Sequence, residues 1–383
     1  MDRDFALTPE EIELRESVAE FARKELQDDV AGRDRNEEFW REGWNRCARF
    51  GLPGLPIPAE YGGSGLGMLS TIAAMEGLGR GCKDAGLVFS LNAQMWSFEL
   101  PVLLHGTEEQ RRRWLPPLCA GEAIAVHGMT EPGAGSDPAG ITTRYRAGAD
   151  GYVLNGTKTF ITNAPVADAV LVFATNDPSK GHTAVTGFIV ERGAPGLSFG
   201  RPMEKMGLRT SPIGEVVLED VVVPQSSRLG PEGAGMRIFN SSMEWERACI
   251  FASHVGTMER QLEEAIAYAR VRRQFGRPVA KFQSVQDRLV DMRVRLDAAR
   301  LLVYRVGWLK DRGKSAVAEA AIAKLFVSEM YAQSALDAVR VHGGYGYMTE
   351  FEVERGLRDA VGGLLYSGTS EMQRRVIAAY LGL

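Results

Sequence analysis

Residues 340–373 read RVHGGYGYMTEFEVERGLRDAVGGLLYSGTSEMQ, and two glycine-rich turns separate segments of helical pattern in this stretch. The turns span residues 343–346 and 367–370. Glycine lets the backbone approach another molecule closely and frees N–H groups to point at it. One such turn is typical of a helix C-cap. Two turns, with Arg340 and Arg355 beside them, predict a site for a flat, anionic ligand.

Outward from this stretch, the chain divides into three parts, which together predict an α+β fold. Residues 1–120 read as helical and begin with a capping box, in which Thr8 precedes Pro9 and Glu11 follows. Residues 121–232 carry short β-branched and aromatic runs between turn signals, which predict an antiparallel sheet domain. Within them, Asn155-Gly156 is typical of a hairpin turn.

The third part, residues 233–383, returns to helical periodicity. Val285, Leu289, Met292 and Leu296 step by four and three, as on a long helix of a four-helix bundle. The sequence therefore predicts an N-terminal helical domain, a middle β domain and a C-terminal bundle.

Composition narrows the function classes. The chain has 383 residues, a net charge of −4 and 45% hydrophobic residues, so we expect a globular protein that does not bind nucleic acid. Four scattered cysteines without a CxxC pair predict reduced thiols and a cytoplasmic location. Five histidines without ligand spacing predict no metal site. The acidic N-terminus lacks the apolar core of a secretion signal, and no apolar run predicts a membrane span.

Three further segments carry polar groups suited to a cofactor. TEPGAGSD at 130–137 is a small-residue loop that offers N–H and hydroxyl donors. GTKTFITNA at 156–164 adds an aromatic side chain and hydroxyls, and RRQFG at 272–276 adds a guanidinium suited to a pyrophosphate. Each segment alone is equally compatible with an ordinary turn or a surface charge.

In this order, and with FQSVQ at 282–286 and the block at 343–373, these segments resemble the motifs of the acyl-CoA dehydrogenase superfamily of flavoenzymes. The resemblance covers essentially the whole chain. It implies the same three-domain fold, FAD as cofactor and a homo-oligomer, commonly a tetramer. No GxGxxG follows a first strand, so a nicotinamide-binding Rossmann domain is not predicted.

The resemblance also implies roles for individual residues. From the middle domain, the residues expected to contact the flavin are Met129, Thr130, Ser136, Phe160 and Thr162. The residues that match positions reaching the FAD of a neighbouring subunit are Arg272, Phe275, Arg340, Gly343 and Gly344. Thr369 and Glu371 are expected near the pyrophosphate.

The catalytic base departs from the common family pattern. Many members carry glutamate where Ser367 stands, and a serine hydroxyl cannot take a proton from carbon at neutral pH without a base of its own. In isovaleryl-type members the glutamate lies on another helix, at the position of Glu246. We therefore assign Glu246 as the base and the Ser367 backbone N–H as a donor to the thioester carbonyl. The bland alternative for Glu246 is a surface carboxylate paired with arginine.

Three more residues are expected at the substrate: Glu244, Arg247 and Gly368. Glu244 is also the fallback base, with ion pairing as its alternative role. The implied reaction removes a proton next to a thioester carbonyl and passes hydride from the next carbon to flavin.

The sequence leaves the substrate and the electron acceptor open. An acyl-CoA is the first interpretation. The alternative is a prolyl or other acyl group on a carrier protein, which GCKDAGLVFS at 81–90 and LLYSGTSEMQ at 364–373 favour by resemblance. Arg111–Arg113 is either a docking patch for an acidic carrier or a solvated face. The acceptor is a flavoprotein or oxygen, and a non-catalytic flavin-binding assembly partner is the alternative from another class.

Overall fold

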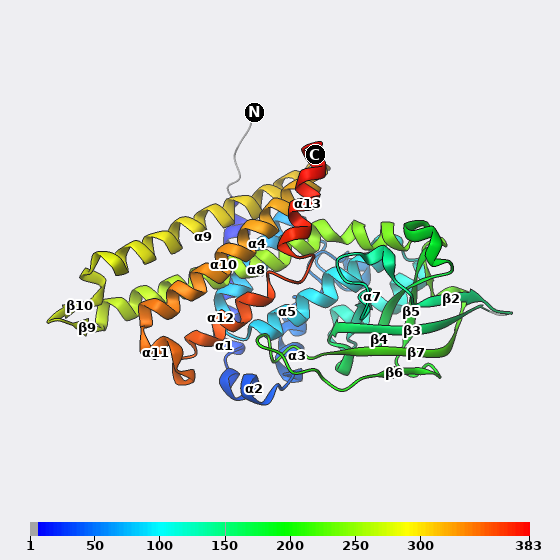
Figure 1. The fold of residues 1–383 in the computed structure, drawn as a ribbon, viewed down its shortest axis with the longest axis horizontal. Helices are drawn as coiled ribbons and strands as arrows, with labels where there is room; N and C mark the ends of the chain where they lie inside the picture. Colours follow the sequence, from blue (N-terminus) through cyan, green and yellow to red (C-terminus); the bar gives the residue numbers. More distant parts are fainter. Residues whose placement is uncertain (1–6, 150) are drawn as a thin grey trace.

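The computed structural model describes residues 7–149 and 151–383. Residues 1–6, which contribute to the interpretation of the N-terminus as lacking a secretion signal, lie outside that range. The sheet occupies one end of the molecule and the long helices extend to the other (Figure 1). Helices, then strands, then helices follow one another along the chain, as the sequence predicts.

The N-terminal part is helical. Its elements are α1 (Pro9–Glu25), α2 (Val30–Asn36), α3 (Arg41–Arg49), η1 (Ala59–Tyr61), α4 (Met68–Gly81), α5 (Ala85–Gln94), the π-helical turn η2 (Met95–Glu99), α6 (Leu100–His105) and α7 (Glu108–Cys119). The predicted capping box is present, because the Thr8 N–H donates to Glu11 Oε2 at 2.8 Å and the Glu11 N–H donates to Thr8 Oγ1 at 3.3 Å. The continuous run Ala85–His105 is long and apolar enough to cross a membrane by length and composition, but most of it is buried inside the protein.

The middle part is a sheet. Its elements are β1 (Ala125–Gly128), η3 (Pro138–Gly140), β2 (Arg144–Ala147), β3 (Gly151–Thr162), η4 (Ala164–Val166), β4 (Ala169–Thr175), η5 (Pro178–Ala184), β5 (Val185–Glu191), β6 (Leu197–Phe199), β7 (Ile213–Pro224), η6 (Gln225–Ser227) and β8 (Arg228–Leu229). The strand order is β6-β7-β3-β2-β4-β5-β8, and β1 also pairs with β4. Most pairs are antiparallel as expected, but β1 and β2 run parallel to β4, so the sheet is mixed.

The predicted hairpin at Asn155-Gly156 is wrong. β3 continues through both residues and pairs with β2 and β7. Here β7 carries an extra residue and Asp220 has φ 49°; its N–H donates to Asn155 Oδ1 at 2.8 Å. Gly156 has φ 149°, and a Cβ there would lie 2.5 Å from Thr143 Oγ1. The glycine therefore serves a bulge and a close strand approach, two uses that share the sequence signature of a turn.

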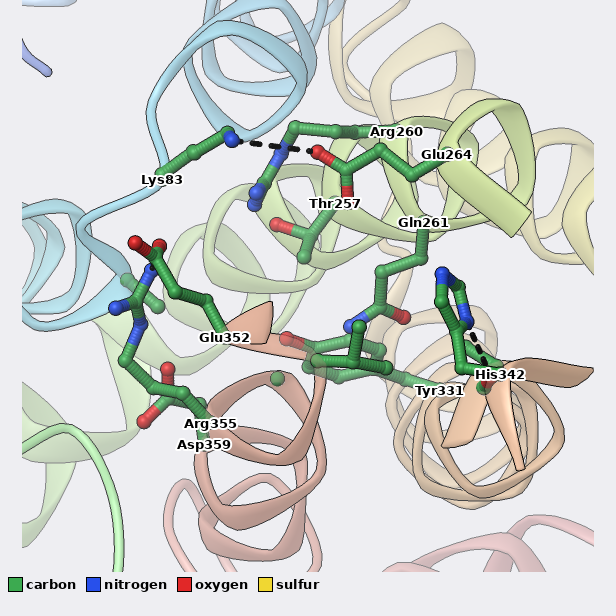
Figure 2. Close-up of a pocket in the computed structure, with 14 residues that line it drawn as sticks. Lys83, Thr257, Arg260, Gln261, Glu264, Tyr331, His342, Glu352, Arg355 and Asp359 are labelled. Carbon is green, nitrogen blue, oxygen red and sulfur yellow. Dashed lines mark hydrogen bonds and ion pairs between the residues drawn. The ribbon is translucent and has the colours of Figure 1, made fainter. Parts of the chain in front are cut away.

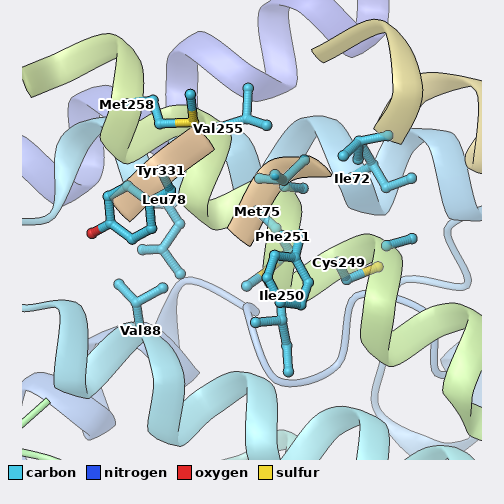
Figure 3. Close-up of a cluster of buried hydrophobic side chains, with 14 of the residues drawn as sticks. Ile72, Met75, Leu78, Val88, Cys249, Ile250, Phe251, Val255, Met258 and Tyr331 are labelled. Atoms are coloured by element: carbon cyan, nitrogen blue, oxygen red, sulfur yellow. The ribbon is translucent and has the colours of Figure 1, made fainter. Parts of the chain in front are cut away.

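The C-terminal part is a helical bundle. Its elements are α8 (Gly235–Val271), β9 (Arg273–Gln274), β10 (Arg277–Pro278), η7 (Val279–Lys281), α9 (Gln283–Lys310), α10 (Val317–His342), α11 (Gly344–Tyr347), η8 (Thr349–Phe351), α12 (Val353–Gly362) and α13 (Ser370–Tyr380). α8 packs on α4, α9 and α10, so the N- and C-terminal helices share one apolar core. Figure 3 shows part of it, including Met75, Phe251 and Tyr331. Burying a side chain of this size contributes roughly 1.5–3 kcal/mol.

The four cysteines are free and buried. Burial raises the pKa of the Cys82 thiol to about 12, so this thiol stays protonated. Within residues 7–149 and 151–383, no three His, Cys, Asp or Glu side chains group as metal ligands.

Replacing Gly156 with alanine tests the bulge. The new Cβ would meet Thr143, so we expect Gly156→Ala to lower the free energy of unfolding by about 2–4 kcal/mol. Urea denaturation followed by circular dichroism measures it. Gly193→Ala is the matched control, because a Cβ at Gly193 has no atom within 4 Å, and we expect a change of about 0.5 kcal/mol or less. Equal losses in both variants would contradict this account.

Candidate active site

Glu246 on α8 meets Ser367 in the turn between α12 and α13. The Ser367 hydroxyl donates to Glu246 Oε1 at 2.6 Å, although 121 positions separate the two residues. The Arg247 Nε donates to the Ser367 carbonyl at 3.3 Å. The structure therefore brings together three predicted site residues: the assigned base, the serine and Arg247.

The turn at Ser367 is fixed by its own residues. Ser367 and Gly368 have φ of 56° and 86°, so the chain reverses there in the left-handed region. The Gln373 amide donates to the carbonyls of Ser367 at 3.1 Å and Gly368 at 2.9 Å. Thr369 caps α13 through its hydroxyl, which accepts from the Met372 N–H. Among the described residues, no hydrogen bond uses the Ser367 backbone N–H, which leaves it available to a ligand.

The Glu246 carboxylate has the electrostatics of a base. Its side chain is buried, and Oε2 has no hydrogen-bond partner among the described residues. Burial raises the pKa of Glu246, while the Ser367 hydroxyl and the Arg247 charge act in the opposite direction. A carboxylate with one free oxygen and a raised pKa can accept a proton from a substrate held beside it. Glu246 is thus not the solvated surface carboxylate that the bland alternative describes.

A pocket lies one helical turn along α8 from Glu246, which does not itself line it. It includes about 320 Å³ of atom-free space, open to solvent in part, between α5, α8, α10 and α12. Ile250 and His254 line it from the face of α8 that carries Glu246, because residues four apart on a helix share a face. The Tyr366 hydroxyl lies 2.8 Å from His254 Nε2, and the Tyr366 and Phe89 rings lie tilted to each other with their centroids 4.5 Å apart. Tyr366 therefore links the Ser367 turn to the cavity wall.

Polar groups occur in that wall. Burial, with a contribution from the Lys324 charge, lowers the pKa of His254 to about 3, so its ring is neutral at neutral pH. Burial raises the pKa of Asp359 to about 6, and one oxygen of its carboxylate accepts from the Leu208 N–H at 2.6 Å. Asn92 lines the cavity from α5. The cavity therefore suits a short group that carries a polar atom.

A second cavity of about 460 Å³ adjoins the first and shares Thr257, Tyr331 and Asp359 with it. Figure 2 shows its polar lining, in which Lys83 Nζ lies 3.8 Å from Glu264 Oε1. Arg355 and Glu352 pair at 2.7 Å. Most of its charges are thus paired with one another, and Glu246 and Ser367 line neither of the two pockets.

The flavin-contact residues predicted in the middle domain lie together at the β1 and β3 strands. The Thr159 N–H donates to the Thr130 carbonyl at 2.9 Å, which joins the segment after β1 to β3. Phe160 has φ 56° and is 63% exposed, so its ring stands out from the sheet. Met129 is buried, whereas Ser136 is exposed in the following loop. Thr162 ends β3.

The residues predicted to reach a neighbouring subunit's FAD lie at the opposite end of the molecule, around β9, β10 and α11 (Figure 1). The Arg272 guanidinium lies 5.2 Å above the Tyr345 ring, which joins the two segments. Phe275 is 92% exposed, and a Cβ on Gly343 or Gly344 would meet no atom within 4 Å. Arg340 lies on the same end and pairs with Asp337 at 3.5 Å. Within one chain, these residues therefore lie away from the sheet that carries the other predicted flavin contacts.

Two predicted residues have other contacts. Glu244 accepts from Lys310 Nζ and from the Ala316 N–H, both at 2.5 Å, so both of its oxygens hold the α9–α10 connection. These contacts fit its ion-pairing alternative. Glu371 is exposed in the first turn of α13 and lies 3.7 Å from Arg374. The assigned roles of all these site residues stay predictions.

Three family models match the chain almost throughout. The acyl-CoA dehydrogenase N-terminal domain matches residues 8–122, the middle domain residues 127–221 and the C-terminal domain residues 233–382. The chain belongs to the acyl-CoA dehydrogenase family. It is therefore an oxidoreductase of the class that acts on CH–CH bonds.

Named relatives cover nearly the full chain. A curated relative from Pseudomonas fluorescens, L-prolyl-[peptidyl-carrier protein] dehydrogenase, is 46% identical over 92% of this chain and 93% of its own. The solved prolyl acyl carrier protein oxidase AnaB is 48% identical, with a TM-score of 0.97, over 99% of this chain and 100% of its own. The structure of PigA with FAD and proline is 39% identical, with a TM-score of 0.97, over 99% of both chains.

Some residues of this acyl-CoA dehydrogenase site were not expected from the sequence. His254, Tyr366 and Gln373 were missed, as was the direct hydrogen bond between Ser367 and Glu246. The spacing of Glu246, Ile250 and His254 by four could have indicated the shared helix face. No sequence signal indicates Gln373, because its role depends on how the turn folds back.

Removing the Ser367 hydroxyl tests whether its hydrogen bond to Glu246 lowers the pKa of that base. The hydrogen bond from Ser367 lowers the pKa of Glu246, so Ser367→Ala should raise that pKa further. A base must be deprotonated to act, so the acid limb of the kcat/KM profile should move to higher pH, with activity recovering above the limb. Ser370→Ala is the control, because that hydroxyl donates to Glu329 instead. An unmoved acid limb in Ser367→Ala would contradict the contact's role.

Proposed function

We propose that this protein catalyses the FAD-dependent α,β-dehydrogenation of an acyl thioester, with Glu246 as the general base. The observation that carries the proposal is the buried Glu246 carboxylate, with one free oxygen, beside a turn whose Ser367 N–H is unused. Family membership and a relative solved with FAD support the cofactor. The exposed Phe160 ring and the open backbone at Gly133 and Gly135 fit a flat ring system near β3.

The residues of the chain divide the work. Glu246 Oε2 takes the proton from the carbon next to the thioester carbonyl. The carbonyl oxygen gains negative charge as that proton leaves, and the Ser367 N–H donates to it. Arg247 and Gln373 keep the Ser367 turn in place through their hydrogen bonds to its carbonyl oxygens. Bound FAD supplies the acceptor for the hydride from the next carbon, which leaves a carbon–carbon double bond.

The acyl group that we propose is prolyl on a carrier protein, with a short acyl-CoA as the alternative. Two relatives above 45% identity are named for prolyl groups on carriers. The pocket one helical turn from Glu246 is lined by Asn92 and His254, whose polar atoms suit a ring nitrogen better than an alkyl chain. Of the Arg111–Arg113 cluster, Arg112 and Arg113 pair with Glu108 and Glu191, which favours a solvated face.

Assembly and location also belong to the proposal. Arg272 and Phe275 lie far from Phe160 within one chain, so a shared FAD site needs a second copy, and we propose a homo-oligomer, a tetramer in the simplest form. A cytoplasmic location agrees with four free cysteines. The electron acceptor is a flavoprotein or oxygen, and oxygen uptake measured against dye reduction separates the two.

Glu246→Gln tests the base. The amide cannot take a proton, so flavin reduction by substrate should fall by roughly 10³-fold or more while FAD stays bound. Stopped-flow absorbance under anaerobic conditions measures both. Glu263→Gln, an exposed carboxylate further along α8 that pairs with Arg80, is the control with an expected rate close to wild type. Near wild-type reduction in Glu246→Gln would return the base to Glu244, whereas a wild-type protein that binds FAD but that no thioester reduces would favour the non-catalytic alternative.

A thioester panel tests the substrate. Prolyl-loaded carrier protein should bleach the flavin band faster than butyryl-CoA or octanoyl-CoA, because the prolyl nitrogen can pair with the polar groups that line the pocket. Free proline serves as the control for the thioester. Preferential bleaching by octanoyl-CoA would exclude the prolyl assignment but keep the dehydrogenase reaction.

A further inference from the structure

A buried ion pair joins the two segments predicted to face the flavin. Lys158 Nζ on β3 lies 2.7 Å from Glu131 Oε1, and the two side chains are 0% and 3% exposed. Both residues lie in segments predicted to bind the cofactor, but neither was itself assigned a role. Because a buried charge is costly unless it is paired and hydrogen-bonded, a pair kept here needs a reason in the geometry around it.

Each group of the pair holds a part of the loop after β1. Lys158 Nζ also donates to the Met129 carbonyl at 3.2 Å. Glu131 Oε2 accepts from the Thr142 N–H at 2.6 Å and from its hydroxyl at 2.8 Å, and Oε1 accepts from the Thr143 N–H at 2.9 Å. Glu131 therefore ties the start of the loop 131–143 to its end, and Lys158 holds the start of that loop against β3.

The pKa values agree with a pair that is charged in the folded protein. Burial opposes the charged form of Glu131, but the Lys158 charge and the loop donors lower its pKa to about 2. Burial lowers the pKa of Lys158 to about 8, with Glu131 opposing that shift. At neutral pH the carboxylate thus accepts four hydrogen bonds, which a neutral group could not do in the same geometry.

We propose that the Lys158–Glu131 pair is a positioning element for the flavin: it sets the distance between the 129–136 loop and the Phe160 side of β3, and so fixes the walls of the isoalloxazine site. The inference rests on the proposed FAD-dependent function. Met129, Thr130 and Ser136 lie on the loop that the pair fastens, and Phe160 lies two residues beyond Lys158. The pair itself touches neither substrate nor the reacting atoms.

The test measures FAD affinity in variants of the full-length protein. In Lys158→Met, the long apolar chain keeps the volume but removes the donor, and we expect FAD affinity to fall by roughly tenfold or more, with an altered flavin absorption band. Arg33→Met is the matched control, because it breaks a buried ion pair with Asp84, 7% and 1% exposed, in the helical part. It should lower thermal stability without changing FAD affinity or the band.

Two further variants separate positioning from stability. Lys158→Met/Glu131→Gln removes both charges, so stability should recover while FAD affinity stays low, because the loop bonds remain incomplete. Thr142→Val removes one hydroxyl donor at an exposed position and should weaken FAD severalfold in a folded protein, even if Lys158→Met does not fold.

The positioning role would be overturned if FAD affinity fell in proportion to thermal stability in every variant, including an equal fall of FAD affinity in Arg33→Met. Unchanged affinity in both Lys158→Met and Thr142→Val would also overturn it. If the wild-type protein binds no FAD, both the proposed function and this inference are wrong. If the wild-type protein binds FAD and the Lys158 and Thr142 variants bind it equally tightly, only this inference is wrong.

Discussion

The burial of one carboxylate governs the arrangement around it. Glu246 sits inside the helical body with a single neutral donor, the Ser367 hydroxyl, and one free oxygen. A charged group in that position is costly unless its neighbours are fixed, because each missing donor leaves the charge less compensated. The turn at Ser367 is accordingly held by Arg247 and Gln373 and reversed through left-handed backbone at Ser367 and Gly368. The turn next to the charge is thus held by several hydrogen bonds.

Helix α8 connects this site to the rest of the molecule. It begins beside the sheet, where Met236 and Ile238 belong to the core under β4 and β5, and continues into the core shared by the long helices. Glu246 lies between these two regions of the same helix. A bend or slip in α8 would therefore move the base relative to both the sheet and the Ser367 turn.

The sequence predicted the order of the parts, the capping box at Thr8, the helices and the meeting of α8 with the 367–370 turn. The first three depend on local residue types, whereas the meeting of α8 with the turn was implied by the family resemblance, because no local pattern reports a contact across 121 positions. The bulge at Gly156 was misread, because Asn-Gly serves a turn and a bulge equally well. The Lys158–Glu131 ion pair was not predicted, because 27 positions separate the two residues and the sequence around a lysine does not show whether its side chain is buried. The contact between His254 and Tyr366 arises from tertiary packing, which residue spacing in the sequence does not predict.

Strand β3 carries two irregularities that cancel. Between Leu154 and Gly156 the extra residue lies on β7, and between Lys158 and Ile161 it lies on β3, so both ends of the strand keep one register while the middle is displaced by one residue. The alternation of faces breaks there: Lys158 and Thr159 are both buried, and Phe160 turns outward. The length of this window is constrained, because the two extra residues must offset each other for both ends of β3 to stay in register. A deletion of one residue would leave the outer ends of β3 paired out of phase and would turn the Phe160 position to the other face of the strand.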